Sequence, residues 1–183
     1  MQKLRKMLGE ADSPYIISLM RLIETQSKTT LANWCMDYCE EHILPIFTKH
    51  FPKNKPYNRL QNGPKNTLKI AREVLEGKTP FHYAKNVILN SCHYPARELN
   101  DNPIAQAAAR ACGQACSSVH VPTHALGFCF YASAAIAYDR VGLYESTEVY
   151  DQIAAEECGR MEAALRAMAV ENEPNPAKIN WNC

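Results

Sequence analysis

Helix-starting signals recur along the whole chain, and they constrain its fold more than any other feature. A residue that can cap a helix stands directly before a proline, which fits the first helical position because its missing N–H would have no partner there. The signals are Asp12 or Ser13 before Pro14, Thr79 before Pro80, and Asn102 before Pro103. Pro64 and Pro122 start further segments in the same way.

Between these signals, apolar residues repeat every three to four positions, which is the spacing of one helix face. Ile16, Leu19, Leu22 and Ile23 show this pattern in the first segment. No segment alternates apolar and polar residues with the period of two that is typical of a strand. The sequence therefore predicts an all-α fold, a single-domain bundle of six or seven helices.

Two of the predicted helices, 103–119 and 122–141, carry apolar or small residues on nearly every side, so we expect them at the centre of the bundle. Pro45 should kink or restart the second helix, and Pro95 should kink or break the fourth near Tyr94. Residues 52–63 read as a loop. We expect one helical domain over 1–170 and an irregular C-terminal tail over 171–183.

The charges of the chain are nearly balanced. Twenty Lys and Arg against 19 Asp and Glu give a net charge of +1, which argues against a strongly basic nucleic-acid-binding protein.

The longest uncharged stretch, 111–138, contains Gln114, His120 and His124 and is too polar for a membrane span. No long apolar run of a secretory signal precedes Glu10. We expect a cytoplasmic protein without a nucleic-acid or membrane partner.

Eight cysteines are spread over the chain, at positions 35, 39, 92, 112, 116, 129, 158 and 183. Without a secretory signal, free thiols that pack as small apolar side chains are the expected state. Cys35/Cys39 and Cys112/Cys116 form two CxxxC pairs on apolar helix faces. Two disulfides between these pairs, or four thiolates around zinc, remain alternatives.

His120 and His124 form the sharpest polar feature of the sequence. Four residues apart, they could bind zinc or another divalent metal, with His93 or a cysteine as a third ligand. Pro122 lies between them, however, so His120 should end one helix and His124 should begin the next. The favoured interpretation is structural: both rings lie near the bundle centre, hydrogen-bonded to backbone carbonyls or to a nearby side chain, such as Arg110 acting through water or a carboxylate. No metal or cofactor is then expected.

Trp34 and Arg110 complete the candidate binding residues, which are His93, Arg110, His120, His124 and Trp34. Aromatic residues such as Trp34 could line a ligand pocket, but at helical spacing they are expected in the core. The acidic pairs at 40–41 and 156–157 read as solvent-facing. The chain contains no nucleophile elbow, P-loop, dinucleotide fingerprint or zinc-protease motif, so no enzyme is predicted.

Three segments together resemble a known family: NWCMDYCEEHILPIF, AREVLEG, and AARACGQACSSVHVPTHALGFCFYASAAI. The matching positions are Trp34, Cys39, Leu44, Pro45, Arg72, Gly77, Arg110, Gly113, Ala115, His120, Val121, His124, Ala125, Leu126, Gly127, Tyr131 and Ala132. Over about residues 31–140 the chain is similar to the bacterial immunity proteins grouped as the immunity-protein-five-like family.

This resemblance implies an α-helical protein that binds a cognate bacterial toxin and blocks it without catalysis, and it supplies no catalytic residues. Two other functions stay open beside it. The histidines could serve a metal-binding or small-ligand-binding protein. The small residues of the central helices could instead serve a structural module that forms a homodimer.

Overall fold

The computed structural model describes residues 4–51 and 63–181, and within these ranges all regular structure is helical. The α-helices are α1 (Pro14–Glu24), α2 (Lys28–Tyr38), α3 (Leu44–His50), α5 (Gly63–Leu75), α6 (Phe81–Ile88), α7 (Tyr94–Glu98), α8 (Pro103–Ser117), α9 (His124–Val141) and α10 (Thr147–Met168). The loop predicted at 52–63 lies outside the described residues except for Gly63, which begins α5.

Two short π-helical turns, η1 (Cys39–Ile43) and η2 (Leu89–His93), join helices that run on through them. Each turn directly precedes a proline-containing segment, Leu44-Pro45 or Tyr94-Pro95. A proline inside a regular α-helix would clash with the carbonyl four residues earlier, and a wider π turn relieves that clash. The interruptions predicted at both prolines are confirmed, and their form is a π turn within a continuous helix.

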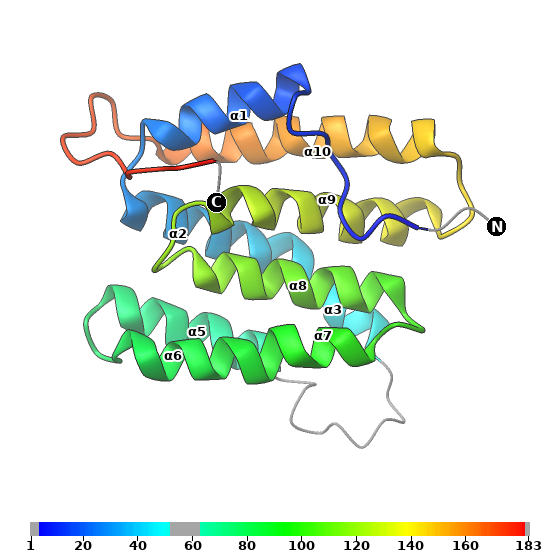
Figure 1. Ribbon diagram of the computed structural model, residues 1–183, viewed down its shortest axis with the longest axis horizontal. Coiled ribbons are helices and arrows are strands. Elements are labelled where there is room, and N and C mark those ends of the chain that lie inside the picture. Colours follow the sequence, from blue (N-terminus) through cyan, green and yellow to red (C-terminus); the bar gives the residue numbers. More distant parts are fainter. Residues whose placement is uncertain (1–3, 52–62, 182–183) are drawn as a thin grey trace.

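The described part of the chain therefore holds seven helical rods, in agreement with the predicted all-α bundle of six or seven helices. In Figure 1 these rods form layers. Helices α1 and α10 pack together on one side, α5 and the α6–α7 rod lie on the other, and α8 and α9 run between them. The two helices predicted at the centre do lie there, and their buried residues are mostly alanine and cysteine.

The segments before α1 and after α10 are irregular but held in place. The N-terminal segment lies against α9, where Leu8 N–H donates to the Phe130 carbonyl at 3.1 Å and the Tyr138 hydroxyl donates to the Arg5 carbonyl at 2.6 Å. After Met168 the tail returns to the α1–α2 junction, where Ala177 N–H donates to the Gln26 carbonyl at 2.8 Å.

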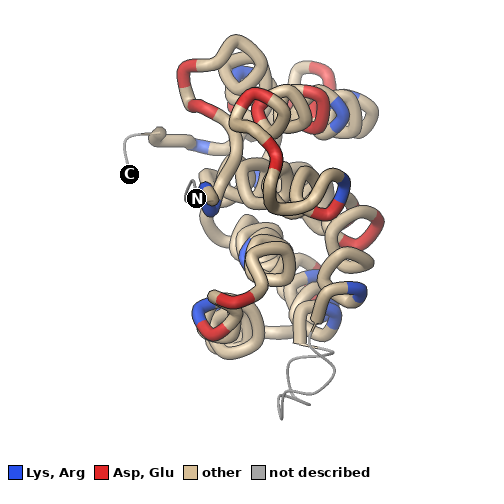
Figure 2. The backbone as a smooth tube through the Cα atoms, turned by 90° about the vertical axis from the view of Figure 1, so that its right-hand side faces the viewer, with Lys and Arg blue, Asp and Glu red and all other residues tan. Residues whose placement is uncertain are grey.

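Charge is unevenly distributed over the bundle. Acidic residues gather in the layer of α1 and α10 (Figure 2), and α10 alone carries five acidic and two basic side chains. None of the described helices is long and apolar enough to cross a membrane.

Candidate functional site

One row of polar side chains follows α8 at four-residue intervals: Gln106, Arg110 and Gln114. We call it the α8 strip. Gln106 is 8% exposed, and its Nε2 donates to the Ala96 carbonyl at 2.6 Å and to Asn100 Oδ1 at 3.0 Å. It thereby ties the end of α7 to α8. Because spacing of four residues places side chains on one helix face, the strip lies along the seam between α8 and its neighbours.

At its other end, the strip holds the start of α9. Nδ1 of His124 lies 2.6 Å from Oε1 of Gln114, so that the ring N–H donates to the amide oxygen. Gly127 makes room for this contact, because a Cβ at that position would lie 2.8 Å from Gln114 Oε1. The expected position of His124 at the start of a helix is confirmed, and its ring is half-buried.

His93 packs against the strip between Arg110 and Gln114. It is the last residue of η2, and its ring lies over Gly113, where a Cβ would come within 2.7 Å of the ring carbon Cε1. Burial, together with repulsion from His124 and Arg110, lowers the pKa of His93 to about 4. The ring is therefore neutral at pH 7 and packs as an uncharged side chain.

His120 lies apart from this cluster. It follows the end of α8 by three residues and is exposed, and its ring stacks on Phe81 with centroids 4.0 Å apart. The expectation that its ring is near the bundle centre is wrong. The helix ends at Ser117, and the turn before Pro122 brings residue 120 out to the start of α6.

In the ranges that the structure covers, the histidines are not part of a group of residues that could bind a metal ion. No three His, Cys, Asp or Glu residues there are grouped closely enough to hold an ion. His93 faces Gly113, His124 is hydrogen-bonded to Gln114, and His120 stacks on Phe81. A protein zinc site generally needs at least three ligands from the chain, and these three rings do not converge.

Trp34 is part of the core. Its side chain is 1% exposed, its indole N–H donates to the Met161 carbonyl at 3.1 Å, and its ring meets Phe128 edge-on. It joins α2 to α9 and α10 and offers no surface to a ligand.

The cysteines described are all free and buried, as expected for small core residues. The two CxxxC pairs do meet, with the sulfurs of Cys39 and Cys112 3.3 Å apart. Burial raises the pKa of Cys39, and the adjacent Cys112 thiol raises it further. The Cys39 thiol therefore stays protonated, which makes it a poor nucleophile or metal ligand in the folded chain. Cys183 lies outside the described residues.

Glu157 is a buried carboxylate that sequence reasoning missed, because the acidic pair 156–157 was expected to face solvent. Only Glu156 is exposed, whereas Glu157 is 2% exposed. The Tyr38 hydroxyl donates to Glu157 Oε1, and Arg160 donates to Oε2 at 3.2 Å. These residues and His42 line a hollow of about 440 Å³ beside η1. Tyr38 lies on α2, 119 residues before Glu157 in the sequence, so the contact leaves no local sequence signal.

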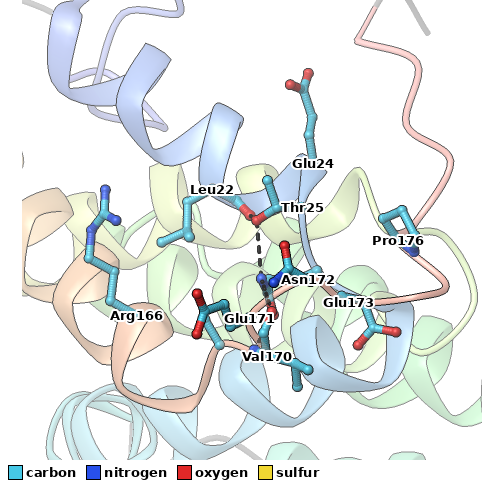
Figure 3. A pocket seen from close by; sticks show the side chains of 11 residues that line it. Leu22, Glu24, Thr25, Arg166, Val170, Glu171, Asn172, Glu173 and Pro176 are labelled. Carbon is cyan, nitrogen blue, oxygen red and sulfur yellow. Dashed lines mark hydrogen bonds between the residues drawn. The ribbon is translucent and has the colours of Figure 1, made fainter.

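Two further hollows open on the surface. One of about 680 Å³ lies between the end of α1 and the tail, lined by Glu24, Arg166, Glu171 and Glu173 among others (Figure 3). The other, of about 200 Å³, contains Arg110 of the α8 strip and lies under the N-terminal segment.

Comparison with known proteins identifies the family. A family model described as "Imm-5 like putative immunity protein" matches residues 21–164. The chain belongs to this Imm-5 like family. The match is wider at both ends than the resemblance seen at 31–140, and it includes the whole α8 strip. No curated protein matches the chain. No solved structure matches it either.

Proposed function

We propose that this Imm-5 like protein binds and neutralises a cognate bacterial toxin, acting as a stoichiometric inhibitor rather than an enzyme. The observation that carries the proposal is the family match over residues 21–164, which takes in α2 to α9 and most of α10. The partner is a toxin protein. The Imm-5 like protein acts in the cytoplasm of the cell that makes it and protects that cell from the toxin.

The arrangement of polar groups supports binding over catalysis. The buried thiols have raised pKa values. His93 and His124 are engaged with Gly113 and Gln114, and Glu157 is held by Tyr38 and Arg160. Each of these groups stabilises a junction between helices. A rigid helical scaffold of this kind suits the presentation of a preformed surface to a partner.

The experiment is a rescue of growth. Each open reading frame adjacent to the native gene is expressed from an inducible promoter in a heterologous bacterium, with and without this chain. One neighbour should arrest growth, and co-expression of the chain should restore it while both proteins elute as one complex in size-exclusion chromatography. If no neighbour causes an arrest that this chain relieves, the proposal is overturned.

A further inference from the structure

We propose that the pocket around Arg110 is a carboxylate-binding site, and that an acidic side chain of the bound toxin fills it. The proposal rests on the proposed function for the identity of the partner. It rests on the pocket itself for the chemistry of the ligand.

The pocket is a small, defined hollow of about 200 Å³. It is lined by Leu4, Arg5 and Lys6 of the N-terminal segment, by the first half of α8, and by Asn100 and Tyr138. The N-terminal segment is held in place, since the Tyr138 hydroxyl donates to the Arg5 carbonyl and the Arg5 guanidinium pairs with Asp151. A volume of this size accepts the end of one side chain, whereas sites for cofactors and drug-sized ligands start at about 300 Å³.

Arg110 is the member of the α8 strip that has an unpaired polar atom among the described residues. Its Nε is buried without a hydrogen bond. Its guanidinium lies 5.8 Å from the centre of the Tyr131 ring. Other arginines of the molecule do hold carboxylates: Arg5, Arg72, Arg140, Arg160 and Arg166. A buried donor left unpaired is uncommon and needs an explanation. A ligand held by the terminal nitrogens of the same guanidinium would supply one.

The charge in the pocket favours an anion. Arg5, Lys6 and Arg110 line it, and none of the described lining residues is acidic. Arg5 is paired with both Glu10 and Asp151, so the positive charge available to a ligand comes from Lys6 and Arg110. The guanidinium fork matches a planar carboxylate with two parallel hydrogen bonds, and the amides of Asn100 and Gln106 add polar groups nearby.

Exposed lysines on the helices beside α8 agree with an acidic partner. Lys65, Lys69 and Lys85, on the layer of α5 and α6 beside α8, are exposed. Such a field attracts an acidic surface and orients it before contact.

The first test uses acetate as the probe on the purified chain. The side-chain N–H signal of Arg110, assigned by its loss in Arg110→Met, is followed by NMR as sodium acetate replaces sodium chloride at constant ionic strength. We expect a saturable shift that Arg97→Met leaves intact, because Arg97 also stacks on a tyrosine, Tyr94, but lies outside the pocket. A shift that does not saturate, or one produced by inorganic phosphate and not by acetate, overturns the carboxylate site.

The second test uses the complex with the toxin. Arg110→Met should raise the Kd roughly 30-fold or more, the usual effect of removing one member of a buried ion pair, and Arg97→Met should leave it within threefold. One Asp or Glu substitution in the toxin should give the same loss and add nothing to Arg110→Met in a double-mutant cycle. If the wild-type chain restores growth but Arg110→Met and Arg97→Met bind the toxin with equal affinity, this inference alone is overturned. If the wild-type chain does not restore growth, the proposed function is overturned. If acetate still shifts Arg110 in the complex, the toxin does not fill the pocket.

Discussion

Gly113 marks the point where the ring of His93 crosses α8. A helix interior usually favours alanine over glycine by about 1 kcal/mol, since glycine loses more backbone freedom on folding. The close approach of His93 reverses that preference here, because a Cβ would lie 2.7 Å from Cε1, 2.9 Å from Nε2 and 3.1 Å from Nδ1 of the ring. The glycine is required by a contact between helices and not by a turn.

We therefore expect Gly113→Ala to destabilise the protein by about 1–3 kcal/mol, as for other cases of overpacking. Gly159→Ala is the matched control: Gly159 lies inside α10 with open space around its Cβ position, so the change should stabilise by up to ~1 kcal/mol. Urea unfolding of both variants measures the difference. In a His93→Ala background, Gly113→Ala should cost much less than it does in the wild type, and an equal cost in both backgrounds would contradict the assignment to His93.

Acid should weaken the fold through His93. Its pKa is about 4 in the folded chain, lowered by burial, and near 6.5 when unfolded, so between these values the unfolded state binds more protons. The contribution of His93 to the free energy of unfolding is therefore present in full well above pH 6.5, and it is lost as the pH drops towards 4. We expect a loss of roughly 1–2 kcal/mol between pH 6.5 and 5, with His124, whose pKa is also lowered by burial, adding in the same direction.

Urea unfolding at pH 5, 6 and 7 measures this dependence, and His93→Gln supplies the comparison because glutamine does not titrate. The slope of stability against pH should be smaller in the variant. Equal slopes in the two proteins would show that His93 does not carry the effect.

At the scale of single elements, local signals in the sequence account for most of the helices. Cap-and-proline pairs predicted the starts of α1, α6 and α8, and apolar periodicity predicted which faces are buried. The sequence does not single out every cap: Thr29 and Thr30 could also cap α2, but Ser27 is its N-cap. Several residues near a helix start can accept from its free N–H groups, and packing decides among them.

The π turns were harder to predict. They allow Pro45 and Pro95 inside continuous helices, and no short sequence pattern distinguishes this outcome from a break in the helix. The polar contacts of the site were also harder to predict. The partners of Glu157, Gln114 and Gly113 come from other helices. Sequence reasoning named His93, His124 and Arg110, but the geometry that relates them depends on how α8 packs between its neighbours.

The caps of α1 and α2 give a paired prediction. Ser27 Oγ accepts from Thr30 N–H at 3.2 Å, whereas Ser13, at the start of α1, makes no side-chain cap bond. Ser27→Ala should therefore destabilise by about 1 kcal/mol, and Ser13→Ala by much less. Thermal unfolding of the two variants tests the difference, and equal losses would contradict the cap assignment.

On the scale of the whole molecule, the cysteines report on the integrity of the core. All seven in the described ranges are buried. Burial raises the pKa of Cys158 to about 11, and it also raises the pKa of Cys35, Cys39, Cys92, Cys116 and Cys129. Because the thiolate is the reactive form, the native protein should react with a thiol reagent at these seven positions only as fast as it unfolds. Mass spectrometry after brief labelling measures this. Rapid native labelling of several of them, or their recovery as disulfides, would contradict a core of free thiols.

The proposed function also concerns the whole molecule: we propose that the protein neutralises a toxin by binding it stoichiometrically. The most direct measurement titrates purified toxin with the purified chain and follows the toxin's own activity. The account predicts a linear fall that ends at one chain per toxin and is restored when the complex is dissociated. Complete loss of activity at a small fraction of that ratio would indicate catalytic inactivation, and full activity with the chain in excess would show that the two do not form the proposed complex.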